Sequence, residues 1–220
     1  MVQALWLFLP AYVANMSPVL SAKLAPGWNA PIDGGRHHKD GRRMLGDGKT
    51  WRGLAGGALL GGLAALGMSY LAAPMGGAGW LPGWDFGRQG YAGGDIGAAP
   101  GVCEGTQCQF VIHTTGPLLV FLFGAVVGLM ALLGDAAESY LKRRTGRDRG
   151  AAWFPFDQLD FVVFGLLGML LASPLLPAGW VIEALFGHWL ILTTLIVGTP
   201  ALHLLVNRIG YWLKLKDVPW

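Results

Sequence analysis

The sequence predicts an all-α, polytopic membrane protein that forms a single integral-membrane domain over residues 1–220. Three observations support this fold class. Of the 220 residues, 53% are hydrophobic and only 13% are charged, whereas soluble globular domains carry about 25% charged residues. Several apolar stretches are long enough to cross about 30 Å of hydrocarbon as helices. The Lys and Arg residues gather in alternate connections between these stretches, a pattern that is typical of membrane proteins.

We expect about five transmembrane helices, which we place near residues 2–21, 53–73, 116–135, 159–176 and 182–206. The fourth stretch is short, and the first is interrupted by Asn15 and Pro18. Because the first stretch lacks a basic n-region and a small-residue cleavage site, we interpret it as a retained helix and not as a signal peptide. Asn15 and Pro18 indicate either a broken helix that lines a cavity or a harmless kink.

The distribution of positive charge predicts the orientation of the chain. Seven Lys and Arg residues lie between the first two spans, five between the third and fourth, and three after the fifth. Together these are 15 of the 16 Lys and Arg residues in the chain, and only Arg88 lies on the other side. Cytoplasmic loops carry the excess of Lys and Arg. We therefore expect the N-terminus outside, the C-terminus in the cytoplasm, and the loops at 22–52 and 136–158 on the cytoplasmic side of the cell membrane.

The connection at about 74–115 differs in composition, and we expect it outside. It is rich in Gly and Pro and contains both cysteines, Cys103 and Cys108. An outer location permits a disulfide between them, and two free thiols are the alternative. The sequence contains no nucleic-acid-binding pattern, and the orientation explains the net charge of +3.

The first of two polar loops on the cytoplasmic side contains NAPIDGGRHHKDGRRMLGDGKTWRG. Its glycines allow backbone N–H groups to approach an anion closely, and Lys49 and Arg52 supply positive charge near the start of the second span. Lys49 and Thr50 follow Gly48 as at the end of a Walker A motif, but Arg43 stands where that motif begins with glycine. We exclude a P-loop ATPase and retain two alternatives, a phosphate-binding loop and a solvated basic anchor.

The second polar region reads GDAAESYLKRRTGRDRGAAWFPFDQLDF. If the third span continues as a helix beyond residue 135, then Asp135, Ser139 and Lys142 share one face, with Arg143 beside them. An ionisable residue at the edge of a span is costly to bury and is usually functional. This face therefore indicates a functional site.

Asp157 and Asp160 are spaced i, i+3 at the start of the fourth span. With Asp135 they would provide three carboxylates among cations, a combination that suits a divalent metal ion bound together with a polyphosphate. A structural role is the alternative. Asp157 would then be an N-cap, Asp160 a favourable acid in the first helical turn, and the basic run an anchor to anionic lipid.

The combination of PIDGGRHHKDGRRMLGDGKTWRG, GDAAESYLKRR and DQLDF resembles the CDP-archaeol synthase family. These are membrane cytidylyltransferases, distantly related to the phosphatidate cytidylyltransferases. The resemblance covers both polar loops, the flanking spans and the five-helix layout. It implies a reaction in which CTP and a lipid phosphate, digeranylgeranylglyceryl phosphate, give a CDP-lipid and pyrophosphate in the presence of Mg²⁺. The long outer connection looks like an insertion relative to compact members of the family.

The resemblance also implies that the motif residues surround the nucleotide. In the second region we expect Asp135, Asp157 and Asp160 to be ligands of Mg²⁺. We expect Ser139, Lys142 and Arg143 there to be catalytic residues. In the first loop we expect the CTP-binding residues Asp33, Asp47, Lys49, Thr50 and Arg52.

The expected partners are CTP, a lipid phosphate and membrane lipids, and a homodimer stays open. The nearest alternative function is a phosphatidate cytidylyltransferase that makes CDP-diacylglycerol. A different alternative is a small membrane transporter or scaffold, in which GGALLGGLAALG would provide close helix packing. The charged residues cluster at one surface and none pairs at the midplane, which argues against a transporter.

Overall fold

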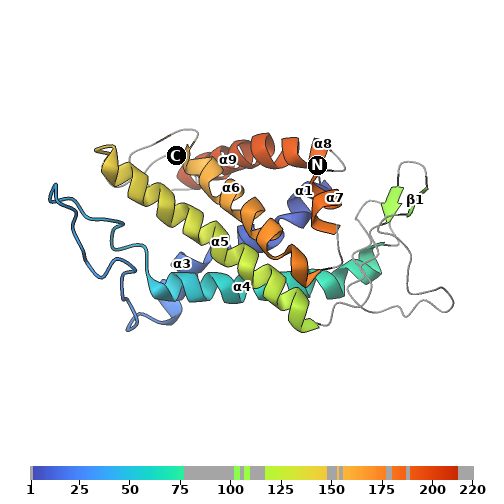
Figure 1. The fold of residues 1–220 in the computed structure, drawn as a ribbon, viewed down its shortest axis with the longest axis horizontal. Helices are drawn as coiled ribbons and strands as arrows, with labels where there is room; N and C mark the ends of the chain where they lie inside the picture. Colours follow the sequence, from blue (N-terminus) through green and yellow to red (C-terminus); the bar gives the residue numbers. More distant parts are fainter. Residues whose placement is uncertain are drawn as a thin grey trace.

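The computed structural model describes residues 2–76, 102–104, 107–109, 117–147, 153, 156–176, 180–186 and 189–212. Helices account for most of them. The two longest helices, α4 (Trp51–Gly76) and α5 (Pro117–Arg144), cross each other, and α6 (Phe156–Leu171) packs along α5 (Figure 1). The helical fold class predicted from the sequence is confirmed.

Helices α4 and α5 correspond to the spans that we predicted near 53–73 and 116–135. Among the described helices, they are the two that are long and apolar enough to cross a membrane, over Trp51–Leu71 and Pro117–Arg144. α5 continues for nine residues beyond Asp135. The polar end of this helix is therefore an extension of the span, and Asp135, Ser139 and Lys142 share one helical face as predicted.

The N-terminal stretch forms three short helices instead of the single helix that we expected over 2–21. These are α1 (Val2–Leu7), α2 (Leu9–Asn15) and α3 (Ser17–Leu24). Pro10 and Pro18 lie in the first turns of α2 and α3, where a missing N–H disturbs no helical hydrogen bond. The α-helix is interrupted at Met16, between Asn15 and Pro18, and the chain keeps right-handed helical backbone angles there. Ser17 Oγ, at the break, donates to the carbonyl oxygen of Gly53 at 2.6 Å and ties α3 to α4.

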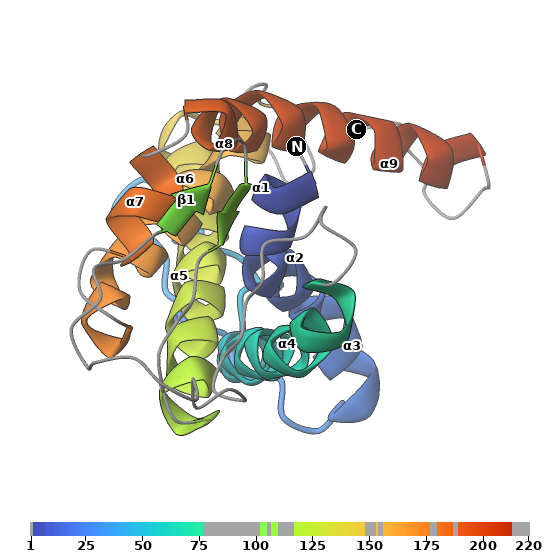
Figure 2. The ribbon, with the colours of Figure 1, turned by 90° about the vertical axis from the view of Figure 1, so that its right-hand side faces the viewer.

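The C-terminal part is also more divided than the sequence predicted. After α6 comes a 3₁₀ turn, η1 (Ser173–Leu175), and the stretch predicted as one helix over 182–206 contains α7 (Trp180–Phe186), α8 (Trp189–Thr193), η2 (Thr194–Gly198) and α9 (Thr199–Trp212). η2 is a π-helical turn. Pro200 follows it, and a proline cannot donate to the carbonyl four residues before it, so the regular α-helical ladder is interrupted there. Figure 2 shows α9 extending to one side of the other helices.

Glycines allow α4 and α5 to cross with their backbones in contact. A Cβ atom on Gly61 would lie 2.4 Å from the carbonyl oxygen of Gly124, and one on Gly128 would lie 2.6 Å from that of Gly57. The glycine-rich segment of α4 therefore provides close helix packing, which small residues permit in membranes. Around this crossing the first helices, α5, α6 and the C-terminal segments share one apolar core, which includes Phe8, Val127, Phe161, Met169, Leu185 and Leu195.

The two polar regions lie at the same end of the molecule. Figure 1 shows the loop at residues 25–50 beside the C-terminal end of α5, and the hairpin of β1 (Val102–Glu104) and β2 (Gln107–Gln109) at the opposite end. This separation agrees with the predicted placement of the 74–115 connection away from both polar loops. In the hairpin the backbone register pairs Cys103 with Cys108. The bonding state of their side chains lies outside the described part of the molecule.

The Gly61 contact predicts a large effect of one methyl group. Gly61→Ala should destabilise the protein by about 1–3 kcal/mol, because the added carbon meets backbone that cannot move independently. Gly67→Ala is the matched control in the same helix, since nothing lies within 4 Å of the position that a Cβ atom would occupy there, and it should be neutral or stabilising by about 0.5–1 kcal/mol. Thermal unfolding in detergent measures both. Equal melting temperatures for the two variants would contradict the crossing.

Candidate active site

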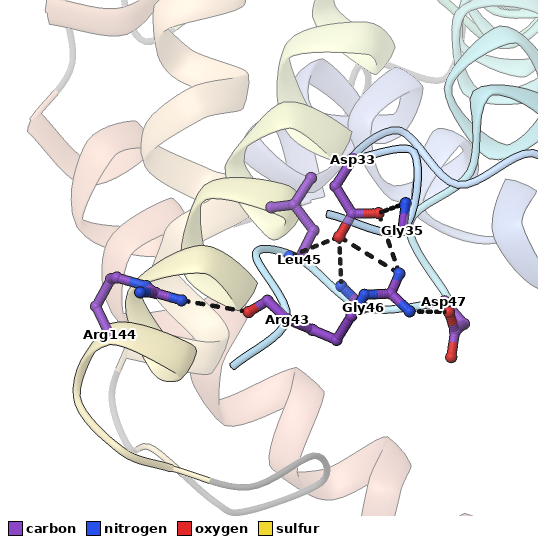
Figure 3. Close-up of polar contacts among 7 residues, drawn as sticks. All are labelled: Asp33, Gly35, Arg43, Leu45, Gly46, Asp47 and Arg144. Atoms are coloured by element: carbon purple, nitrogen blue, oxygen red, sulfur yellow. Dashed lines mark hydrogen bonds and ion pairs between the residues drawn. The ribbon is translucent and has the colours of Figure 1, made fainter. Parts of the chain in front are cut away.

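The first polar loop folds around the carboxylate of Asp33 (Figure 3). Its oxygens accept hydrogen bonds from the backbone N–H groups of Gly35 and Leu45, both at 3.0 Å, and of Gly46 at 3.5 Å. Arg43 Nη2 adds an ion pair at 3.1 Å. The Asp33 side chain is only 2% exposed. The backbone N–H groups that we expected to approach a phosphate are in part used within the loop, since those of Gly35, Leu45 and Gly46 contact the loop's own aspartate.

The charge of Asp33 is strongly stabilised. Burial by itself would raise the pKa of the carboxyl, but the N–H groups of Leu45 and Gly35 and the guanidinium of Arg43 outweigh burial and lower the pKa to about 2. Hydrogen bonds to the ionised form favour that form. Because its oxygens already accept these bonds, Asp33 holds the loop together and is not placed to ligate a metal ion.

Backbone bridges close the loop at its base. Ile32 N donates to Lys49 O at 2.8 Å, and Trp51 N donates to Ala30 O at 3.1 Å. Thr50, which is buried, accepts from Gly53 N at 3.1 Å through Oγ1 and so is the N-cap of α4. The chain therefore enters α4 in a fixed direction directly after Lys49.

Two further residues that we expected to bind nucleotide make contacts within the loop. Arg52 is 8% exposed, and it donates to the carbonyl oxygen of Ala25 at 2.6 Å and to Asn29 Oδ1 at 3.2 Å. Asp47 is 70% exposed at its side chain and pairs with Arg43 at 2.7 Å. Both side chains, like those of Asp33 and Thr50, stabilise the loop in the structure.

Lys49 connects this loop to α5. Its Nζ atom lies 2.5 Å from Asp135 Oδ2, and the two side chains are 21% and 30% exposed. The residues are 86 positions apart in the sequence. The structure thus brings together the predicted phosphate-binding lysine and the predicted metal-binding aspartate.

Three carboxylates converge beside this pair. Ligand oxygens of Asp135 and Glu138 on α5 and of Asp160 on α6 all lie within 4.8 Å of one another. We refer to these three residues as the carboxylate trio. The close approach of the two helices depends on Gly134, because a Cβ atom there would lie 2.7 Å from the carbonyl oxygen of Asp160. Glu138 was not among the predicted residues, although its i, i+3 spacing from Asp135 was a visible signal.

Lys142 and Asp157 lie next to the carboxylate trio. Lys142 Nζ is 2.9 Å from Glu138 Oε1 and also forms an ion pair with Asp157. Asp157 Oδ2 accepts a hydrogen bond from the backbone N–H of Trp153 at 2.7 Å. The predicted ligand Asp157 is therefore paired with a lysine, and Glu138 stands in the trio beside the other two predicted ligands.

The other two predicted catalytic residues lie further along α5. Ser139 is half-buried, and its hydroxyl makes no hydrogen bond within the part of the chain that the structure describes. Arg143 Nη1 donates to the carbonyl oxygen of Arg147 at 2.9 Å. Ser139 could therefore donate to a substrate, whereas the Arg143 side chain contacts the segment that follows α5.

The donor set of the carboxylate trio fits a hard divalent cation. All its ligand atoms are carboxylate oxygens, which Mg²⁺ and Ca²⁺ prefer. Asp160 Oδ1 is buried and lacks a hydrogen-bond partner among the described residues, and a buried anionic oxygen requires a cation or a donor. The trio could therefore hold a metal ion, with Lys49 and Lys142 as neighbouring positive charges.

Asp33 predicts a defined sensitivity of the loop to acid and to mutation. Its pKa lies below the unfolded value of 3.8, at about 2, so its contribution to stability is complete above about pH 4 and is lost as the pH falls through 2. Asp33→Asn removes this contribution at every pH. We expect faster proteolysis within residues 34–48 of that variant at pH 7, measured by limited digestion and mass spectrometry. Unchanged cleavage would mean that Asp33 does not hold the loop.

Comparisons with known proteins identify the family of the chain. A family model described as CarS-like, CDP-archaeol synthase, matches residues 1–76 and 89–220. Within the 74–115 connection, residues 77–88 fall outside the match. The CDP-archaeol synthase of Halobacterium salinarum strain R1 is 42% identical over 219 residues, which cover 100% of this chain and 96% of the relative. That of Methanospirillum hungatei is 38% identical and covers 96% and 99%.

A solved structure extends the similarity to three dimensions. It is that of an intramembrane enzyme for archaeal membrane lipids biosynthesis, and it is 28% identical to this chain with a TM-score of 0.53. The match covers 94% of this chain and 93% of the other. Since the family model matches most of the chain and full-length relatives are 42% and 38% identical to it, the chain belongs to the CDP-archaeol synthase family.

Proposed function

We propose that the cytidylyl group of CTP is transferred to an archaeal lipid phosphate at the site formed by the first polar loop, α5 and α6. The reaction releases pyrophosphate and yields a CDP-activated lipid. The observation that carries the proposal is the contact of Lys49 with Asp135, because it places a loop cation directly beside the carboxylate trio. A triphosphate needs both positive charge and a carboxylate-bound metal ion.

The carboxylate trio would hold the metal ion, and we propose Mg²⁺. When bound there, the metal supplies positive charge that offsets the charge of the phosphate oxygens. Glu138 thereby replaces Asp157 in the ligand set that we expected. Asp157 would orient Lys142, with which it is paired, toward the same substrates.

The chain's own side chains have mainly to position two anions. A phosphate monoester has a second pKa of about 6, so the lipid phosphate is a dianion at cytoplasmic pH and requires no general base. One of its oxygens attacks the α-phosphorus of CTP, the bond from that phosphorus to the bridging oxygen breaks, and pyrophosphate leaves with the electron pair. Lys49 and Lys142 would neutralise phosphate oxygens, and Ser139 would donate a hydrogen bond to one of them.

The family favours an archaeal lipid as the acceptor, and we propose digeranylgeranylglyceryl phosphate. The apolar side chains of Val19, Leu20 and Leu24 on α3 are exposed next to the first loop, where an isoprenoid chain would lie in the membrane. The phosphatidate alternative predicts a different acceptor. Incubation of the purified enzyme with CTP and each lipid phosphate distinguishes the two functions. The natural acceptor should give pyrophosphate release with the higher kcat/KM.

The trio predicts which acids the metal requires. Glu138→Gln and Asp160→Asn should each lower Mg²⁺-dependent pyrophosphate release by at least about 100-fold and weaken Mn²⁺ binding, measured by electron paramagnetic resonance, since each removes an anionic ligand. Asp157→Asn should have a smaller effect on Mn²⁺ binding, because Asp157 lies outside the carboxylate trio. Asp47→Asn removes the same charge at an exposed position and is the control for Mn²⁺ binding. Unchanged Mn²⁺ binding by Glu138→Gln would refute the ligand set.

We also propose that this site faces the cytoplasm, because 15 of 16 Lys and Arg residues lie on its side of the predicted topology. Lys39 is exposed in the first loop. In a variant with Cys103 and Cys108 replaced by serine, Lys39→Cys should resist a membrane-impermeant thiol reagent added to intact cells. It should react after the membrane is permeabilised. Labelling of intact cells would place the loop outside and reverse the topology.

A further inference from the structure

The first polar loop contacts α5 at a second place, remote from the carboxylate trio. Arg144, in the last turn of α5, donates from Nη1 to Asp40 Oδ2 at 3.1 Å and from Nη2 to the carbonyl oxygen of Arg43 at 3.3 Å. Its guanidinium carbon lies 5.4 Å from the centre of the Tyr140 ring. The side chain is 18% exposed. One arginine therefore holds both a carboxylate and a backbone carbonyl of the loop, and Figure 3 shows the second of these contacts.

The carbonyl group that Arg144 holds belongs to Arg43, whose side chain pairs with two acids of the same loop. The Arg43 side chain pairs with Asp33 at 3.1 Å and with Asp47 at 2.7 Å. Asp33 in turn accepts from the N–H groups of residues 45 and 46, which lead directly to Lys49. By holding the Arg43 backbone against α5, Arg144 thus also fixes Asp33 and, through the hydrogen bonds of Asp33, the segment that leads to Lys49.

Arg144 is too far along the helix to take part in the carboxylate trio itself. It follows Asp135 by nine residues, which corresponds to about 13 Å along a helix axis. Its terminal nitrogens contact the loop, whereas the side chain of the neighbouring Arg143 donates to Arg147, in the segment that follows α5. A second loop contact supports the same docking, since Arg42 Nη1 donates to the carbonyl oxygen of Arg143 at 3.5 Å.

We propose that Arg144 is a positioning residue for the cytidylyl transfer. By holding Asp40 and the Arg43 carbonyl against the end of α5, it fixes the loop so that Lys49 meets the triphosphate beside the carboxylate trio. The proposal rests on the proposed role of Lys49 in CTP binding. It differs from a substrate-binding role for Arg144, because the effect of Arg144 passes through Lys49.

Binding of labelled CTP in equilibrium dialysis, kinetics for both substrates and thermal unfolding test the proposal. Arg144→Ala should weaken CTP binding by about 10-fold, the size expected for lost charge-assisted hydrogen bonds. The KM for the lipid phosphate and the melting temperature should stay unchanged. Arg144→Lys, which keeps the charge but lacks the planar fork, and Asp40→Asn, which removes one contact, should give intermediate losses. Arg36→Ala is the matched control, because Arg36 is exposed and its side chain makes no hydrogen bond or ion pair within the described ranges.

The double variant distinguishes positioning from direct binding. If Arg144 acts through Lys49, then Lys49→Ala with Arg144→Ala should bind CTP no more weakly than Lys49→Ala alone. Additive losses would show that Arg144 contacts CTP itself and would overturn the proposal, as would a loss of CTP affinity that only parallels a loss of thermal stability. Wild-type CTP binding by Arg144→Ala, with weakened binding by Lys49→Ala, overturns positioning and spares the proposed function. Wild-type binding by Lys49→Ala overturns the proposed CTP site.

Discussion

The ion pair between Lys49 and Asp135 is the interaction on which the candidate site depends. It joins a loop without regular secondary structure to a long helix, across 86 positions of sequence. A charge at the edge of an apolar span is costly unless it is paired, so each residue makes the position of the other favourable. Both side chains are partly exposed, which leaves the pair accessible to a substrate from the polar end of the molecule.

The carboxylate trio depends on how closely the helices approach. Aspartate side chains are short, so acids on α5 and α6 meet only where the two backbones nearly touch. Gly134 permits this contact next to Asp135, and Gly61 and Gly124 permit the equivalent contact of α4 with α5. α5 thus makes backbone contacts with both neighbours, and a single rigid helix carries Asp135, Glu138 and Lys142 in fixed register.

The sequence predicted the parts of the fold and site that local patterns determine. The apolar runs identified α4 and α5, and helical spacing placed Asp135, Ser139 and Lys142 on one face. The same reasoning missed the divisions of the first and last spans, because hydropathy measures burial in lipid and not the backbone bonds that prolines remove. It also missed the roles of Asp33, Thr50 and Arg52. These residues contact the backbone of their own loop, and no residue pattern distinguishes such a contact from one with a phosphate. The sequence did not indicate that Glu138, and not Asp157, lies within reach of both Asp135 and Asp160, because that proximity depends on how α6 packs against α5.

Backbone N–H groups of the first loop already donate to a carboxylate of the same loop, and this has a consequence for the energetics of the proposed nucleotide binding. Because Asp33 already satisfies the N–H groups of Gly35, Leu45 and Gly46, the loop needs no bound anion to become ordered. Ordering a flexible segment upon binding subtracts from affinity, and here folding of the protein has met that entropic cost in advance. Loop order is in this respect a property of the fold, and under the proposed function CTP binding would require little coupled folding of this loop.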